Sequence, residues 1–218
     1  MKSKILLIVL FSIIIFTSCR KDNNEVFHLS GTITDSKSGN GIEGAEIIFW
    51  SSKIQSGVFN SNYETIAVLT TDYKGSYSVD IKNEKVIGYK VSISKFNYFS
   101  YEEDISAESF LPDKSYVLNY SINPAGYIKL RAVNTNPYDS NDFISYRFIS
   151  GYMNCMYCCN NVANKGYGEN FDSTFVCKTI GGSKPVISWN VIKNGQSVIN
   201  SAEINCPVFD TVYFVISY

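Results

Sequence analysis

Five cysteines in the second half of the 218-residue chain have the types and spacing that most favour chemistry. Cys155, Cys158 and Cys159 lie within one short segment, and Cys177 and Cys206 follow separately. A Cys-x-x-Cys pair with two further thiolates can hold zinc, whereas the same thiols pair as disulfides in an oxidising compartment. Spacing alone leaves both possibilities open, and the compartment must decide between them.

Catalysis by histidine or by paired carboxylates has little support. His28 is the only histidine, which removes multi-histidine metal sites, and we expect it to be a surface strand residue. Glu102, Glu103 and Asp104 are consecutive, so on a strand they alternate between two faces, as expected at a solvated sheet edge. We expect no catalytic residue, no metal and no cofactor. A hydrolase with an unrecognised carboxylate site is the least favoured alternative.

Aromatic side chains are the best candidates for binding. The chain has 16 Tyr, 14 Phe and 2 Trp, and several lie in segments rich in turn-forming residues. In loops, aromatic groups can stack on sugar rings or anchor a protein partner. The segment 154–172 is long for a loop and rich in cysteine, and such loops commonly carry function. The possible ligand-facing residues are Tyr98, Phe99, Tyr101, Tyr152, Tyr157 and Tyr167.

The charge balance excludes one class of partner. The 19 basic and 20 acidic residues give a net charge of -1, so no positive field indicates nucleic-acid binding.

The elements that position these residues are predicted to be strands. No helical periodicity follows residue 25, and alternating or β-branched runs recur between competent turns, which is typical of all-β proteins. The predicted strands are 27–34, 45–50, 64–71, 76–81, 86–94, 116–122, 127–133, 143–149, 174–179, 186–192, 198–204 and 208–217.

The segment Ser121–Gly126 divides the strands into two groups. Pro124 removes a ladder donor and Gly126 relaxes the backbone, which favours a domain boundary near Asn123. We therefore predict two β-sandwich domains in tandem, over residues 26–122 and 123–218.

Three motifs in the first half occur in the order of a known family. They are Ser30–Asp35 (SGTITD), Gly41–Ile47 (GIEGAEI) and Thr70–Tyr77 (TTDYKGSY). Together they resemble the carboxypeptidase regulatory-like domain, which has a transthyretin-like (prealbumin-like) sandwich. The resemblance covers about residues 26–122 and implies an accessory module without catalytic residues. Residues 123–218 resemble no family that the motifs identify.

The same motifs make local predictions. Ile33 and the alternating Ile47 and Phe49 should point into the core. Asp35 and Asp72 should cap tight turns through their carboxylates, and Gly75 should close the hairpin.

The first 18 residues have the pattern of an export signal. Lys2 and Lys4 precede the apolar run Ile5–Phe16, which is shorter than the roughly 20 residues that span a bilayer. The following Thr17-Ser18-Cys19 resembles the lipobox of bacterial lipoproteins, which implies cleavage before Cys19 and acyl chains on it. Such chains would hold the protein in a membrane.

The segment after Cys19 is polar. Residues 19–25 form the expected lipidated tether, and RKDNNE resembles the acid-containing stretch of Bacteroidetes-type surface lipoproteins. We therefore expect anchoring in the outer membrane, facing the periplasm or the cell surface.

The predicted export decides between zinc binding and disulfides for the five cysteines. Oxidising conditions favour two disulfides and one free thiol over zinc. Cys158 and Cys159 are adjacent and should reach different partners, with Cys177 and Cys206 as the natural candidates. A redox role would need a βαβ context that the sequence lacks.

These observations lead to ranked functions. We predict a non-catalytic, membrane-anchored lipoprotein that acts as an extracytoplasmic binding or adhesion module for a protein or glycan. The alternative is a structural or assembly subunit of an outer-membrane complex.

The lipid anchor gives a direct test. Cys19→Ala should move the protein from the detergent phase to the aqueous phase in a partitioning experiment, because the acylated residue is lost. Unchanged partitioning would contradict lipidation of Cys19.

Overall fold

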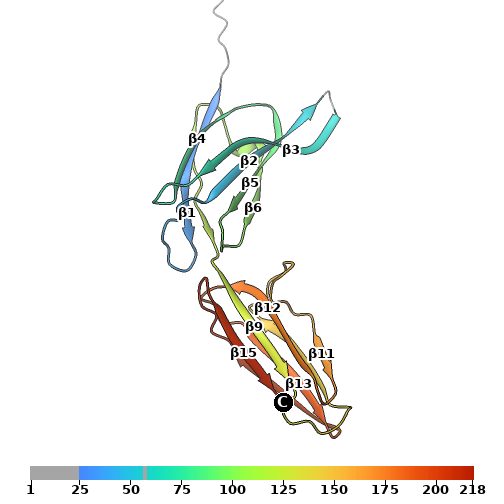
Figure 1. Ribbon diagram of the computed structural model, residues 1–218. Helices are drawn as coiled ribbons and strands as arrows, with labels where there is room; N and C mark the ends of the chain where they lie inside the picture. Colours follow the sequence, from blue (N-terminus) through green and yellow to red (C-terminus); the bar gives the residue numbers. More distant parts are fainter. Residues whose placement is uncertain (1–24, 56–57) are drawn as a thin grey trace, which may run out of the picture.

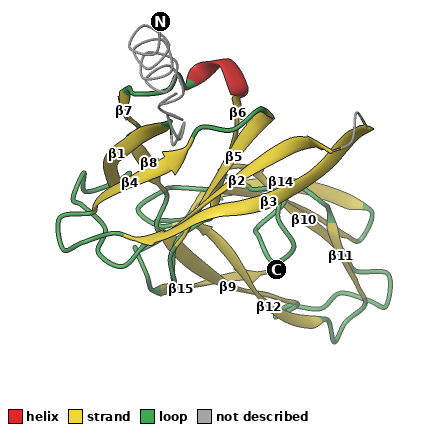
Figure 2. Cartoon of the chain, turned by 90° about the horizontal axis from the view of Figure 1, so that it is seen from above, coloured by secondary structure: helices red, strands yellow, loops and turns green. Residues whose placement is uncertain are grey.

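The computed structural model describes residues 25–55 and 58–218, with the side chains of residues 54–61 excepted. These residues form two β-sandwich lobes in tandem (Figures 1 and 2), which confirms the predicted all-β class. Between the described strands lie turns, loops and one short 3-10 helix, Ala107–Ser109. The strands are β1 (Val26–Asp35), β2 (Glu46–Gln55), β3 (Val58–Thr70), β4 (Ser76–Lys82), β5 (Val86–Ser94), β6 (Tyr101–Ser106), β7 (Ser115–Val117), β8 (Tyr120–Ile122), β9 (Ala125–Val133), β10 (Phe143–Ser150), β11 (Asn164–Tyr167), β12 (Asp172–Ile180), β13 (Val186–Lys193), β14 (Gln196–Glu203) and β15 (Thr211–Ser217).

The predicted export signal, Cys19 and most of the tether lie outside the described residues. Within the described part of the chain, no helix has the length and apolar character needed to cross a membrane.

The first lobe, residues 25–122, encloses its own hydrophobic core between two sheets. One sheet has the order β4-β1-β7, with β8 also paired to β1, and the other has the order β3-β2-β5-β6. Ile33, Ile47 and Phe49 are buried in this core, as the alternation predicts. Burial of each such side chain contributes on the order of 2 kcal/mol to folding, so the inward rows of β1 and β2 fix the register.

Two aspartates cap turns of the first lobe as predicted. Asp35 Oδ1 accepts hydrogen bonds from the backbone N–H groups two and three residues later, at 2.7 and 2.8 Å. Asp72 Oδ1 accepts from the N–H groups of Lys74 and Ser76, both at 2.8 Å. Burial acts to raise the pKa of Asp35, but these amide donors outweigh it and lower that pKa.

The second lobe, residues 125–218, also has its own core. One sheet has the order β12-β9-β15, in which β15 runs parallel to β9, and the other has the order β11-β10-β13-β14. Inward side chains from both sheets fill the space between them. Those that are fully buried include Ile128, Leu130, Ile144, Ile187 and Ile216.

Two strands lie outside the predicted strand ranges, and the first of them confirms the solvated sheet edge expected for Glu102, Glu103 and Asp104. β6 contains the acids Glu102–Asp104 at the edge of its sheet, next to β5 alone. β11 is a four-residue strand within the supposed loop 154–172. Tyr101 therefore belongs to a strand rather than a loop, and its ring packs on Tyr120 with centroids 5.3 Å apart. The segments of β6 and β11 form strands because they pair with β5 and β10, and pairing with another segment cannot be read from local composition.

The connection between the lobes differs from the relaxed linker that the sequence suggests. Pro124, Ala125 and Gly126 are buried, and β9 begins directly after Pro124. Gly126 is needed for close approach, because a Cβ there would overlap Pro207 and Cys206. The N–H of Ala125 donates to Asn97 of the first lobe at 2.7 Å. The connector is thus buried and hydrogen-bonded, while independent folding of residues 26–122 and 123–218 stays a prediction.

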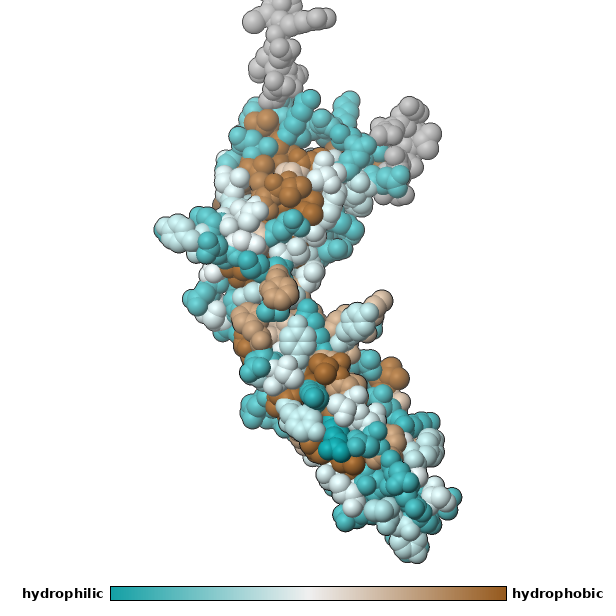
Figure 3. All heavy atoms as spheres, viewed as in Figure 1, coloured by the Kyte–Doolittle hydropathy of each residue, from teal (hydrophilic) through white to brown (hydrophobic). Residues whose placement is uncertain are grey.

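Lys178 of β12 joins the lobes at their junction. Its Nζ donates to the carbonyl of Tyr98 at 3.0 Å and lies 4.2 Å from the centroid of the Phe99 ring. Burial lowers the pKa of Lys178. The ring of Tyr98 also packs on Phe209, with centroids 5.1 Å apart. These contacts link the two lobes. The lobes are arranged end to end (Figures 1 and 3).

The hairpin glycine of the first lobe provides a matched test. Gly75 and Gly39 both have positive φ, at 77° and 74°. A Cβ at Gly75 would lie 2.7 Å from the Ile42 nitrogen, whereas a Cβ at Gly39 would meet nothing. We expect Gly39→Ala to lower the free energy of unfolding by about 1 kcal/mol and Gly75→Ala by at least about 2 kcal/mol. Urea denaturation measures both, and equal losses would show that the Gly75 contact is absent.

Candidate binding site

The cysteine-rich segment forms two disulfides in the second lobe. Cys155 pairs with Cys158, with their Cα atoms 5.1 Å apart, and Cys159 pairs with Cys177 of β12 at 4.9 Å. The predicted number of disulfides is therefore confirmed, and the adjacent Cys158 and Cys159 reach different partners as expected. The expectation that Cys206 is one of those partners is wrong, because Cys158 pairs with Cys155 within the loop and Cys206 stays a free thiol. We call residues 151–163 the stapled loop.

Cys206 is the remaining thiol. It is buried, and its Sγ lies 3.8 Å from the carbonyl oxygens of Tyr127 and Pro207. Burial raises its pKa to about 11, so the thiol is protonated at neutral pH. The zinc arrangement considered from the sequence would need the sulfurs of Cys155, Cys158 and Cys177, which the disulfides use.

Backbone hydrogen bonds attach the stapled loop to β12. Lys178 donates its N–H to the carbonyl of Tyr157 at 2.8 Å, and Cys159 donates to the carbonyl of Lys178 at 2.9 Å. Thr179 Oγ1 donates to the carbonyl of Gly151 at 3.1 Å. The loop thus continues the hydrogen bonding of β12, which leaves its outer residues little freedom to reorient.

The outer residues of the stapled loop are apolar and exposed. Met156 and Tyr157 lie between Cys155 and Cys158, and their side chains are 84% and 77% exposed. Single exposed apolar residues are common, but two held side by side by a disulfide are preorganised for contact. Aromatic and methionine side chains are enriched in protein interfaces.

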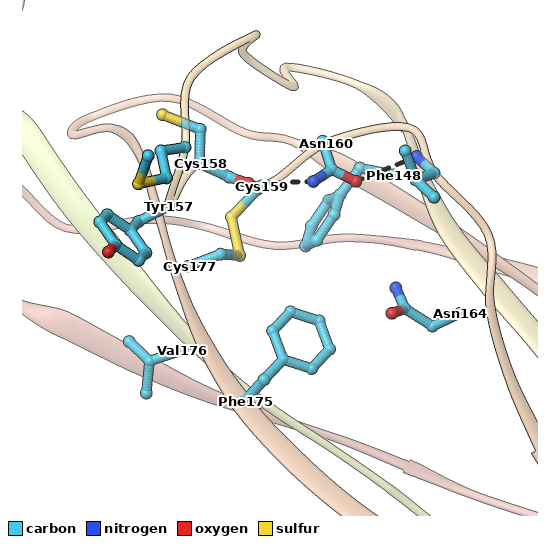
Figure 4. Close-up of a pocket in the computed structure, with 11 residues that line it drawn as sticks. Phe148, Tyr157, Cys158, Cys159, Asn160, Asn164, Phe175, Val176 and Cys177 are labelled. Atoms are coloured by element: carbon cyan, nitrogen blue, oxygen red, sulfur yellow. Dashed lines mark hydrogen bonds between the residues drawn. A yellow bond between two sulfur atoms is a disulfide. The ribbon is translucent and has the colours of Figure 1, made fainter.

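A hollow of about 310 Å³ lies beside these residues, between the stapled loop and β12. Phe148, Phe175 and Val176 form apolar parts of its wall, and the Cys159–Cys177 disulfide lies next to it (Figure 4). Asn164 adds a polar side chain, which makes no hydrogen bond to the described part of the protein. The hollow can accept an apolar group, and the side-chain amide of Asn164 can form a hydrogen bond to a polar group beside it.

The six predicted ligand-facing aromatics separate into two groups. Tyr98, Phe99 and Tyr101 are half-buried and take part in packing at the junction or in the first lobe. The hydroxyl of Tyr98 donates to Asp35 Oδ2 at 3.0 Å, and burial raises its pKa to about 12. In contrast, Tyr152, Tyr157 and Tyr167 are exposed in the second lobe. Only Tyr157 lines the hollow, where Met156 and Val162 are neighbours that aromatic content could not reveal.

His28 has partners on β4 that the sequence did not reveal. Its Nδ1 lies 2.8 Å from Asp80 Oδ1, and its Nε2 lies 3.2 Å from Ser78 Oγ. This is the hydrogen-bond order of a serine hydrolase triad. All three side chains are exposed to solvent, however, whereas such catalysis works in a water-excluded site. We interpret the cluster as a surface hydrogen-bond network.

The carboxylates of β6 do not form a pair across a cleft. Asp104 lines a hollow of about 360 Å³, and no other carboxylate lines it in the described part of the chain. It accepts a hydrogen bond from Tyr63 at 3.2 Å and lies 3.7 Å from Lys90 Nζ. No group of three or more His, Cys, Asp or Glu side chains that could hold a metal occurs among the described residues.

Comparison with known proteins assigns no family. No protein-family model matches the sequence, and no curated protein matches it. The chain is similar in structure to the Bacillus anthracis TIE protein, with 14% identity, a TM-score of 0.37 and coverage of 88% of this chain and 34% of the other. It is also similar to a streptococcal ancillary pilin, with 13% identity, a TM-score of 0.36 and coverage of 89% of this chain and 63% of the pilin. A third similar structure is catechol 1,2-dioxygenase from Acinetobacter sp. ADP1, with 11% identity, a TM-score of 0.35 and coverage of 49% of this chain and 55% of the enzyme.

These similarities carry no conclusion about function. The chain spans about a third of the length of the TIE protein and less than two thirds of the pilin. The TM-scores are low, and the neighbours include both pilins and an enzyme.

The two disulfides make a quantitative prediction. A soluble chain that begins at Arg20 should show one alkylatable thiol, Cys206, after unfolding without reductant. Replacing Cys159 and Cys177 by Ala should cost about 3 kcal/mol of unfolding free energy, since their sequence separation is 18. Replacing Cys155 and Cys158, separated by 3, should cost less than about 2 kcal/mol. Mass spectrometry and urea denaturation check these values; five free thiols would contradict the pairing.

Proposed function

We propose that this protein is a non-catalytic, membrane-anchored lipoprotein that binds a protein partner through the stapled loop. The observation that carries the proposal is the exposure of Met156 and Tyr157 on a loop closed by two disulfides. A binding surface gains affinity when its anchor residues are already ordered, because less conformational entropy is lost on association. The neighbouring hollow can receive one apolar side chain from the partner.

The anchor and the location are parts of the same proposal. The Thr17-Ser18-Cys19 junction supports acylation of Cys19 and attachment to the outer membrane, facing the periplasm or the surface. Disulfides in the second lobe agree with export to an oxidising compartment. For the first lobe, the motifs around Asp35 and Gly75 support an accessory module of the carboxypeptidase regulatory-like type.

A second candidate is an assembly subunit, and β14 favours it. This strand lies at the edge of its sheet, and Val198 and Ile199 are exposed on its two faces. No charged residue or proline occurs from Gln196 to Ala202. Such an edge lacks the usual protection against pairing with another strand.

A capture experiment tests the leading proposal. The soluble chain that begins at Arg20 is immobilised and exposed to a detergent extract of the native cell envelope. We expect the variant with Met156→Ser and Tyr157→Ser to retain less than about a tenth of the partner, because it loses the exposed anchors. Phe96→Ser is the control, since Phe96 is equally exposed but lies in the first lobe.

Two outcomes would contradict the leading proposal. Equal capture by the loop variant and the control would exclude the stapled loop as the binding surface. Loss of capture in Ile199→Lys alone would favour assembly through β14.

A further inference from the structure

The outer face of the sheet β11-β10-β13-β14 has an unusual composition. Phe143 and Tyr167 are directly opposite one another on neighbouring strands, with ring centroids 5.0 Å apart. Tyr167 is 67% exposed, and Ile192 lies on the other side of Phe143. One end of this solvent-facing surface therefore presents an apolar platform.

A hollow of about 410 Å³ extends from this platform over the centre of the sheet. Phe143 and Ile199 contribute apolar surface to its lining, and Ser145, Ser188 and Asn190 contribute polar groups. Asn190 Oδ1 accepts from Ser197 at 2.8 Å, and the Asn190 amide nitrogen has no partner in the described part of the chain. The floor of the hollow thus offers donors and acceptors beside an aromatic ring.

The opposite end of the hollow is positively charged. Arg147 lines it, and Lys165 is placed by the register beside Ser145 on the same face. Neither side chain has an ion-pair partner among the described residues, and Glu203 at the far end of the face is paired with Lys184 at 3.0 Å. A free guanidinium matches a carboxylate in a two-bond geometry.

We propose that this face binds an acidic oligosaccharide that contains uronic acid residues. The apolar side of one sugar ring would lie on Tyr167, whose ring is tilted by 48° to that of Phe143, and a carboxylate of a following residue would bind Arg147. Phe143 and Arg147 are four residues apart on β10, which corresponds to about 13 Å. That span exceeds one sugar ring, so the ligand is a short oligomer. Of the stapled loop, only Ala163 lines this hollow, and Met156 and Tyr157 do not.

The test uses the soluble chain from Arg20 and oligogalacturonate as the probe. Isothermal titration should show binding that weakens as salt increases, with a neutral malto-oligosaccharide of the same length at least tenfold weaker. Arg147→Gln should weaken binding at least tenfold, and Tyr167→Ala at least fivefold. Lys129→Gln is the control, because it makes the same charge change on the other sheet and should leave binding unchanged.

Several results would overturn the proposal. They are absence of binding at millimolar oligogalacturonate, equal binding of the neutral oligomer, and equal loss in Lys129→Gln and Arg147→Gln. Equal binding of single-stranded DNA would show a general polyanion surface instead. The Met156→Ser, Tyr157→Ser variant should bind oligogalacturonate normally, so failure of this inference is distinguishable from failure of the protein-binding proposal.

Discussion

The Cys159–Cys177 disulfide is the constraint on which the candidate binding site depends. It fixes a loop of irregular backbone to β12, with both cysteines buried in the core of the second lobe. Ordering a flexible backbone costs about 1–2 kcal/mol per residue, and a free loop would lose that freedom when it bound a partner. In this protein the loop loses that conformational entropy when the chain folds, so Met156 and Tyr157 are already held in place when a partner binds.

β12 transmits the same constraint to the junction between the lobes. The backbone of Lys178 bonds to the stapled loop, while its ammonium group bonds to Tyr98 and faces the ring of Phe99. A carbonyl and an aromatic face thus stabilise the half-buried charge, with no carboxylate in these contacts. Lys178 of the second lobe thus contacts both the stapled loop and the first lobe, so the position of the loop and the orientation of the lobes are coupled.

Alternation and turn chemistry predicted most strands, because a sheet with one buried face imposes a period of two. Composition failed where a short strand relies on its neighbour, as in β11, whereas the three consecutive acids did indicate the edge position of β6. Gly126 indicated a relaxed linker, yet its role is to admit the backbone of Pro207, which lies far from it in the sequence. The aromatic content identified Tyr157 but could not separate it from Tyr98, which is used in packing. The expected oxidising compartment led to the prediction of two disulfides, but only the fold shows that Cys159 pairs with Cys177 and that Cys206 stays free.

The arrangement of the lobes would give the first lobe a mechanical role if Cys19 carries the proposed anchor. β1 begins at the end of the first lobe that lies farthest from the second lobe (Figure 1). An anchor at Cys19, as proposed, would therefore be separated from the stapled loop by the length of a whole sandwich. A flexible linker would let the second lobe fold back toward the membrane, but the buried connector and Lys178 oppose this motion. With the proposed anchor in place, the first lobe would act as a stiff spacer, and its aromatic residues pack in the core and at the junction.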